Sequence, residues 1–463
     1  MKRMRRIITF ALAALMLAGC GGNVETIDEN DKDVSVVISY WPNKETDTAR
    51  YELYQTYLDI MKERYPDITI VPDEGGYGVD TFMALAATNQ LPNVYRKPFT
   101  EPQQIIKSGY AKDITKFVEK YGYDKKVNSQ LMNIVSSDGK YYGIPYNGYM
   151  IGMWYNTNIL AKAGMLNDDG SVKYPKTYEE LAVMAKEIKD KTGIPGFAIQ
   201  TTGSEGGWMF MNIAWSFGTK FMEQDESGKW KATFNSPECK AALSYIKDLK
   251  WKYDVLPSNV LIDTNELQKI FATDNLAMSI APENYPSAAV TKYKMSKENI
   301  AVGPVMEGPA GQYAQVGGDV WMFSPDTTDE QVDAAFKWFE LLGYTPDISE
   351  DALGRLEETV KADYDAQKLV SQKALKIWID NDRLTAEKEI YDKYKNVNPV
   401  LWSDLMPENV KLQQEEPQCT QNLYKILSNA MQEVLTNENA DVSAIIENAA
   451  QIFQKDYLDK IEG

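Results

Sequence analysis

A strand, a helix and a second strand follow one another between Val34 and Pro72, and this order limits the folds open to the chain. Val34–Tyr40 (VSVVISY) is β-branched and almost continuously apolar, which is typical of a strand covered on both faces of a sheet. Apolar side chains recur at helical spacing over 50–64, and Asp67–Pro72 (DITIVP) again has the pattern of a strand. Right-handed β-α-β crossovers make such strands parallel neighbours, so the predicted fold class is α/β.

Further helix starts continue this alternation along the chain. Thr177–Glu180 is a capping-box sequence, Ser236-Pro237 is an N-cap followed by proline at the first helical position, and Thr328–Gln331 opens another helix. Phe197–Gln200 is expected to be a short strand, and 353–396 has a charged, helical pattern. No internal repeat is present, and the C-terminal part is predicted to be helical.

The N-terminus has the pattern of a secretory leader. Four basic residues precede the apolar run Ile7–Leu17, which is too short to span a bilayer. The run ends in Leu17-Ala18-Gly19-Cys20, which matches a lipobox. We therefore expect 1–19 to be a lipoprotein signal peptide, Cys20 to carry the lipid (palmitate among its acyl chains), and 20–33 to be a flexible tether. The alternative is an ordinary signal peptide followed by an incidental cysteine.

Composition excludes several functional classes. The net charge of −18 argues against nucleic acid as a partner and against an anionic membrane surface, except through the anchor. The chain contains no histidine, which removes Ser-His-Asp and Cys-His catalysis and histidine-dependent zinc sites. Hydrolysis by paired carboxylates stays open. Cys239 and Cys419 either pair or remain as two buried thiols.

One stretch carries a family resemblance. Asp138–Asn156 (DGKYYGIPYNGYMIGMWYN), followed by Leu160–Gly164 and Pro175–Leu181 (PKTYEEL), resembles the extracellular solute-binding protein family of ABC importers, family 1, which is similar to maltose-binding protein. Weaker pieces agree in order from Val34 to Leu342. They are Tyr65–Ile68, Leu91–Tyr95, Asn235–Leu249, Phe271–Met278 and Val302–Gly311.

The resemblance implies two α/β lobes joined by a hinge that the chain crosses more than once, as in periplasmic binding proteins. The expected N-terminal lobe is 34–147 with 303–345, and the expected C-terminal lobe is 148–302 with 346–463, where 346–400 is a helical insertion. Asn93 departs from the family pattern, which has an acidic residue at this position. The family's C-terminal pattern is not recognisable, and Tyr344–Asn396 looks inserted.

A receptor of this type holds its ligand with loops at strand ends, where aromatic faces and planar polar groups suit a sugar. In the first half, the candidates follow the first three strands and the hinge crossing, with Tyr149 at a position where relatives place a contact. These residues are Trp41, Asn43, Lys44, Tyr77, Glu101, Tyr146, Asn147 and Tyr149.

Later candidates follow the strands of the second half and the return through the hinge. Trp208 is the strongest candidate for stacking on a sugar, and Trp402 is favoured over Trp378 as an aromatic lid over the cleft. The candidate residues here are Glu205, Trp208, Asn284, Tyr285, Asp319 and Trp402. The sequence contains no metal-binding or phosphate-binding pattern, so we expect no metal and no cofactor.

The predicted function is capture of a carbohydrate, in the form of an oligosaccharide, by a monomeric receptor that is lipid-anchored on the extracytoplasmic face of the cell membrane. The receptor delivers the solute to ABC permease subunits and is not an enzyme. One alternative is a binding protein for a peptide or an anionic metabolite. Another is a surface glycoside hydrolase that uses Glu101, Glu205 or Asp319 as its carboxylates.

Overall fold

The computed structural model describes residues 33–76, 78–283, 285–403, 405 and 407–461. The predicted lipidation site Cys20 and the candidate ligand residues Tyr77 and Asn284 lie outside the described residues. Within the described part, no helix is long and apolar enough to cross a membrane.

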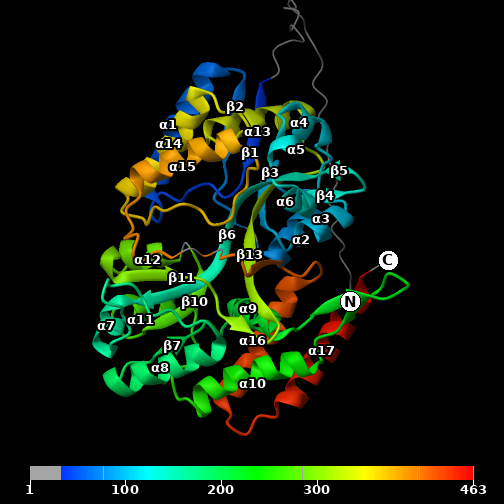
Figure 1. Cartoon of the computed structure of the whole chain (residues 1–463). Coiled ribbons are helices and arrows are strands. Elements are labelled where there is room, and N and C mark those ends of the chain that lie inside the picture. Colours follow the sequence, from blue (N-terminus) through cyan, green and yellow to red (C-terminus); the bar gives the residue numbers. More distant parts are fainter. Residues whose placement is uncertain (1–32, 77, 284, 404, 406, 462–463) are drawn as a thin grey trace, which may run out of the picture.

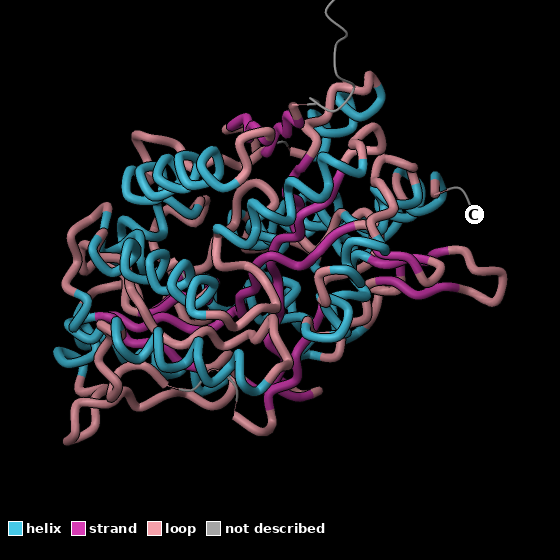
Figure 2. Tube along the Cα trace, turned by 90° about the horizontal axis from the view of Figure 1, so that it is seen from above, coloured by secondary structure: helices cyan, strands magenta, loops and turns pink. Residues whose placement is uncertain are grey.

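Two long strands run between two lobes of mixed α/β structure (Figure 1). They are β6 (Gly143–Asn156) and β13 (Gly311–Phe323), which pair with each other in antiparallel fashion. The strand order is β2-β1-β3-β13-β6-β10-β7, so the sheet of the first lobe continues through β6 into the sheet of the second. Helices cover both sides of these strands (Figure 2).

The first lobe begins with the predicted β-α-β unit. Strands β1 (Val34–Ile38) and β2 (Ile68–Pro72) are parallel neighbours, joined by α1 (Thr48–Arg64). Strand β1 is shorter than predicted because Tyr40 has a left-handed backbone, with φ of 58°. The lobe also contains β3 (Val94–Pro98), α2 (Val79–Ala87), α3 (Pro102–Lys107), α4 (Thr115–Lys120), α5 (Tyr123–Lys126), α6 (Ser129–Met132), β4 (Ser136–Ser137), β5 (Lys140–Tyr141) and α13 (Asp329–Leu341).

The second lobe is built on the far half of β6. This half pairs with β10 (Met278–Pro282) and β11 (Ile300–Gly303), and β10 in turn pairs with β7 (Phe197–Ala198). The helices are α7 (Thr157–Ala163), α8 (Tyr178–Thr192), α9 (Glu205–Phe217), α10 (Pro237–Trp251), α11 (Thr264–Ala272), α12 (Pro286–Thr291), α16 (Thr420–Thr436) and α17 (Val442–Asp456). The short strands are β8 (Met222–Gln224), β9 (Trp230–Ala232), β12 (Glu307–Gly308) and β14 (Val410–Gln414).

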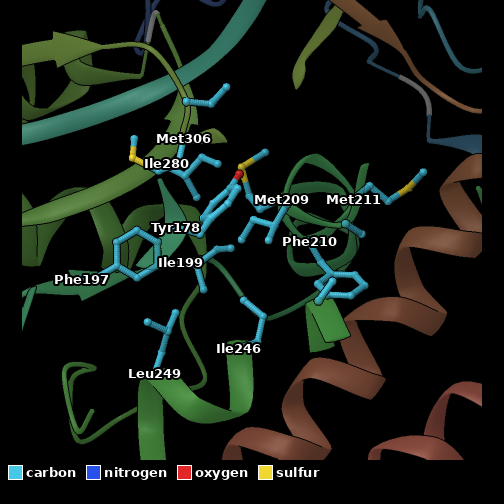
Figure 3. Close-up of a cluster of buried hydrophobic side chains, with 14 of the residues drawn as sticks. Tyr178, Phe197, Ile199, Met209, Phe210, Met211, Ile246, Leu249, Ile280 and Met306 are labelled. Carbon is cyan, nitrogen blue, oxygen red and sulfur yellow. The ribbon is translucent and has the colours of Figure 1, made fainter. Parts of the chain in front are cut away.

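Each lobe has its own apolar core. In the second lobe, Phe197, Ile199 and Ile280 from the strand region face Met209 of α9 and Ile246 of α10 (Figure 3). Burying such side chains stabilises each one by about 1.5–3 kcal/mol relative to leaving it in water. The two lobes are joined mainly by β6 and β13. A site between the lobes is therefore built around these two strands.

The predicted helix starts are confirmed as caps. Thr328 and Gln331 form a reciprocal capping box at the start of α13. Ser236 Oγ accepts from the Cys239 backbone N–H at 3.3 Å. Thr177 Oγ1 accepts from Glu180 N–H at 3.2 Å, but the Glu180 carboxylate accepts from Lys176 N–H rather than closing the box.

The C-terminal insertion differs from the prediction. It forms two helices, α14 (Glu350–Asp365) and α15 (Asn381–Tyr394), separated by a non-helical segment. The sequence grouped 346–400 with the second lobe, but α14 packs on α1 of the first lobe. From α1, Arg64 donates a bidentate pair of hydrogen bonds to Asp351 of α14, and Arg50 Nη2 donates to both carboxylate oxygens of Asp363. These pairs join segments 300 residues apart, which no local pattern reveals.

Both described cysteines are free. Cys239 is buried in the second lobe, and Cys419 is partly buried before α16. Of the two alternatives, the structure supports two unpaired thiols.

Candidate functional site

A cavity of about 420 Å³ lies where β6 and β13 pass between the lobes. Four of the predicted site residues line it, namely Tyr146, Asn147, Tyr149 and Asp319. The strand register brings them together, because Asn147 pairs with Asp319 and Tyr149 with Gly317. Paired residues of neighbouring strands share one face of a sheet, so two segments 170 residues apart in sequence present one surface.

A polar network occupies the side of this surface toward the first lobe. Asn147 Nδ2 donates to Asp319 Oδ2 at 3.0 Å, and Asn147 Oδ1 accepts from Asp319 N–H at 3.0 Å. Arg96 of β3 lies 3.7 Å from the same carboxylate and stacks 3.9 Å above the ring of Tyr40. This arrangement offers a planar carboxylate, an amide and a guanidinium beside an aromatic face, which is the set of groups that binds hydroxyls.

Two further aromatic rings, those of Trp208 and Tyr285, pack next to Tyr149 toward the second lobe and are not among the residues that line the cavity. The centroid of Trp208 lies 5.9 Å from that of Tyr149 and 6.4 Å from that of Tyr285, both edge to face. Trp208 Nε1 is buried and has no hydrogen-bond partner among the described residues. A buried donor without a partner is costly, and a ligand hydroxyl would supply the missing acceptor.

Trp208 is not on a loop, as the sequence suggested, but in the first turn of α9. Two glycines before it allow α9 to approach its neighbours. A Cβ on Gly207 would lie 2.0 Å from the Tyr424 carbonyl oxygen, and one on Gly206 would lie 2.7 Å from the Thr201 backbone. The close packing of α9 on α16 thus holds Trp208 against Tyr149.

Replacing Gly207 by alanine should lower the free energy of unfolding by about 1–3 kcal/mol, since α16 backbone must move to admit the methyl group. Gly354 provides the matched control, because it lies within α14 and a Cβ there meets nothing within 4 Å. Alanine at Gly354 should stabilise the protein by about 0.5–1 kcal/mol. Urea unfolding of both variants checks the pair, and equal effects of the two substitutions would contradict this account of the α9–α16 contact.

Three other predicted residues, Asn43, Lys44 and Glu205, do not line the cavity. Asn43 Nδ2 donates to Glu74 Oε2 at 2.6 Å and so joins the loops that follow β1 and β2, while Lys44 is exposed. Glu205 Oε2 accepts from Thr264 N–H at 3.1 Å and so holds the start of α11. Both interactions shape the loops around the cavity.

The structure corrects the prediction for Trp41 and Glu101. Trp41 is 4% exposed and stacks on Trp338 of α13, with centroids 5.1 Å apart, so it belongs to the core of the first lobe. Glu101 is 8% exposed, and its Oε2 lies 2.8 Å from Nζ of Lys97. A lysine in the interior requires a counter-charge, and the Glu101 carboxylate supplies it. We therefore assign Glu101 to this ion pair and not to ligand binding.

The sequence favoured Trp402, but of the two late tryptophans the structure places Trp378 at the cavity. Trp378 lines the cavity, whereas Trp402 makes a strand-like bridge to Val302 in the second lobe. Trp378 itself is only 4% exposed and contacts the rings of Tyr123 and Tyr344. It therefore supports the wall of the cavity more than it offers a face to a ligand.

Several residues that line the cavity are not among the predicted site residues. Glu283 follows β10, Arg50 lies on α1, and Lys373 lies between α14 and α15. Glu283 had a usable signal, since it directly follows a short apolar strand, β10. Arg50 and Lys373 had none, because their position depends on how the insertion folds back on the first lobe.

Two further carboxyls lie in the second lobe near this region. Burial raises the pKa of Glu415 to about 7, with the charge of Asp319 adding to the effect and a hydrogen bond from Tyr424 opposing it. Burial likewise raises the pKa of Glu416 to about 7, against a hydrogen bond from Trp215 Nε1 at 3.2 Å. Both groups are therefore partly protonated at neutral pH, and each can donate as well as accept.

Comparison with known proteins identifies relatives of this chain. The model of the bacterial extracellular solute-binding protein family matches residues 43–343. The putative ABC transporter periplasmic-binding protein YcjN of Escherichia coli (strain K12) is 22% identical over 57% of each chain. The arabinooligosaccharide-binding protein of Bacillus subtilis (strain 168) is 24% identical over 52% of this chain and 53% of that one. The chain thus spans about half the length of these curated relatives.

The fold is also that of solved binding proteins. An ABC transporter solute-binding protein from Thermotoga lettingae TMO, bound with alpha-D-tagatose, superimposes with a TM-score of 0.68 at 18% identity, covering 91% of this chain and 99% of that chain. The predicted α/β fold with two lobes is confirmed by this match. The C-terminal third, which had no sequence resemblance, is included in it.

Proposed function

The chain belongs to the bacterial extracellular solute-binding protein family, and on that premise we propose that it is the carbohydrate receptor of an ABC importer. The observation that carries the proposal is the cavity between the lobes, where Asn147, Asp319 and Tyr149 present hydroxyl-binding groups on the paired strands β6 and β13. A ligand that touches both lobes favours the closed form by its differential affinity for that form. Transport needs no covalent chemistry from the chain.

Anchoring and delivery complete the proposal. The sequence Leu17-Ala18-Gly19-Cys20 supports a lipid anchor at Cys20, which would keep the receptor at the extracytoplasmic face of the cell membrane. The curated relatives are named as ABC transporter and oligosaccharide-binding proteins, which supports permease subunits as partners of this chain. Mass spectrometry of the membrane-bound protein tests the anchor, and an unmodified Cys20 would contradict it.

A thermal-shift screen of mature protein against mono- and oligosaccharides tests the function. A ligand that binds only the folded state raises the melting temperature in proportion to the logarithm of its concentration over Kd. We expect at least one saccharide to raise it without being altered. Stabilisation only by peptides or by anionic metabolites would replace the carbohydrate assignment, and new reducing ends from an oligosaccharide would replace the receptor by a hydrolase.

Trp208→Ala should weaken the best saccharide by roughly 1 kcal/mol or more, the scale of one lost aromatic contact, because Trp208 closes the aromatic side of the site. Isothermal titration calorimetry measures the change in Kd. Trp251→Ala is the matched control, since Trp251 is 37% exposed at the end of α10 and does not line the cavity. If Trp208→Ala lowers the affinity for the saccharide no more than Trp251→Ala does, the sugar does not contact this group of rings.

A further inference from the structure

The segment between α14 and α15, residues 366–380, crosses from one lobe to the other, and we call it the strap. It lies beyond residue 343, where the match to the family model ends. On the second lobe, Leu369 N–H donates to Ser287 Oγ at 3.2 Å and Ala374 N–H donates to Glu283 Oε2 at 3.4 Å. The strap is therefore attached next to β10 at the mouth of the cavity.

The other end of the strap is attached to the first lobe. Ile377 C=O accepts from Asn128 N–H at 2.8 Å, and Ile379 N–H donates to the Lys126 carbonyl at 2.9 Å. An ion pair between Lys126 and Asp380 adds to these bonds. Backbone hydrogen bonds at both ends hold the strap in one path rather than leaving it as a loose connection.

The middle of the strap touches the hinge itself. Leu375 packs on Gly148 of β6 so closely that a Cβ on Gly148 would lie 2.3 Å from Leu375 Cδ2. Six consecutive or near-consecutive strap residues line the cavity, from Gln372 to Trp378. The strap thus forms a wall of the same cavity that the hinge residues line.

Glu283 and Lys373 bring opposite charges to this wall. Glu283 Oε1 is buried and has no hydrogen-bond partner among the described residues, although Oε2 holds the strap. Lys373 makes no ion pair with a described carboxylate and remains accessible from the cavity.

Resting on the proposed function, we infer that the strap is part of the sugar site, and that Glu283 and Lys373 bind neighbouring hydroxyls of the saccharide unit at this end of the cavity. The carboxylate accepts from one hydroxyl and the ammonium donates to the next, and such charge-assisted bonds are about twice as strong as neutral ones. A buried acceptor without a partner is costly, so Glu283 gains most from a ligand donor. The strap thereby contributes a specificity determinant that the family-matching region does not contain.

The test compares Lys373→Met and Glu283→Gln with matched exposed controls, Lys455→Met on α17 and Glu119→Gln on α4. Glutamine at 283 keeps an acceptor for Ala374 N–H, so the strap remains attached. Calorimetry with the saccharide that gives the largest thermal shift should show a loss of about tenfold or more for each cavity variant and less than about twofold for each control. Melting temperatures of the unliganded variants verify that all four remain folded.

Deoxy analogues of the same saccharide sharpen the result. An analogue that lacks the hydroxyl bound by Lys373 should bind wild type about tenfold more weakly but bind Lys373→Met no worse than the parent sugar does. If wild type binds the sugar and both cavity variants bind it unchanged, the strap is not part of the site, while the proposed function stands. If wild type binds no saccharide, the proposed function fails, and the inference about the strap fails with it.

Discussion

Replacing Lys97 by methionine is expected to lower the free energy of unfolding by about 3–5 kcal/mol. The side chain of Lys97 is 1% exposed and that of Glu101 is 10% exposed, and their charged atoms lie 2.8 Å apart. Lys97 also lies 4.2 Å from the ring centroid of Phe82, within the apolar interior of the first lobe. Methionine removes the positive charge and leaves the Glu101 carboxylate buried without its counter-ion.

The pKa directions of the two groups agree with this expectation. Burial lowers the pKa of Lys97, and the interaction with Glu101 opposes the change. Burial raises the pKa of Glu101, and the interaction with Lys97 opposes the change. Each group therefore stays charged mainly because the other is present, and removing one exposes the full desolvation cost of its partner.

The double variant Lys97→Met with Glu101→Met distinguishes this explanation from simple loss of packing. Replacing both members of a buried ion pair by apolar side chains of similar volume is often neutral or even stabilising. Urea unfolding should therefore show the double variant recovering most of the stability that the single variant loses. A double variant as unstable as Lys97→Met would mean that the ion pair is not the cause.

Raising the pH from about 5 to about 8 is expected to reduce the free energy of unfolding, because Glu415 and Glu416 bind protons more tightly in the folded chain than in the unfolded chain. Both have a pKa of about 7 when folded, against an ordinary glutamate value when unfolded. Their stabilising effect is fully present below the unfolded pKa and is lost as the pH rises through about 7. At about 1.4 kcal/mol per pKa unit, each carboxyl contributes at most about 3 kcal/mol.

Glu415→Gln should remove a large part of this slope. Glutamine keeps an acceptor for Tyr424 and Gln315, whose hydrogen bonds to Glu415 measure 2.5 and 3.3 Å, but it cannot ionise. The measurement is the urea midpoint across this pH range for wild type, Glu415→Gln and the exposed control Glu119→Gln. If the stability of Glu415→Gln falls with pH as steeply as that of the control, Glu415 is not a source of the pH dependence.

Acid unfolding takes place in a lower pH range, so it does not affect the test of Glu415 and Glu416. Hydrogen bonds and nearby cations hold the pKa of Asp351 and Asp329 below the usual range. Groups of this kind stabilise the fold above the unfolded aspartate pKa, and their effect is lost as the pH falls through the lowered folded value. Their contribution is constant across the range in which Glu415 and Glu416 titrate.

Local patterns were sufficient for the elements of the first lobe. The β-branched run at Val34, the helix that follows it and the strand ending at Pro72 appear as β1, α1 and β2 with parallel pairing. Capping residues such as Ser236 and Thr328 mark real helix starts, because their side chains satisfy backbone N–H groups within three residues. These features depend on neighbours in sequence, which a single chain displays.

The candidate site was only partly accessible to the same reasoning. The motif at the hinge crossing pointed to Tyr146, Asn147 and Tyr149, and these residues line the cavity together with Asp319, although all four lie within β6 and β13 rather than at strand ends. Position after a strand misplaced Trp41, since the loop turns at Tyr40 and directs the indole onto Trp338. A residue's place along the chain identifies the edge of the sheet but not the direction in which its side chain points.

The sequence by itself determines the alternation of strands and helices, the exclusion of histidine chemistry, and the motif at the hinge crossing. Each of these depends only on composition or on residues that are neighbours in the chain. Only the folded chain reveals that α14 packs on α1, that Glu101 neutralises Lys97, and that the strap brings Lys373 opposite Glu283. These three facts depend on contacts between segments far apart in sequence. Such contacts depend on the packing of whole lobes, and no short window of residues specifies that packing.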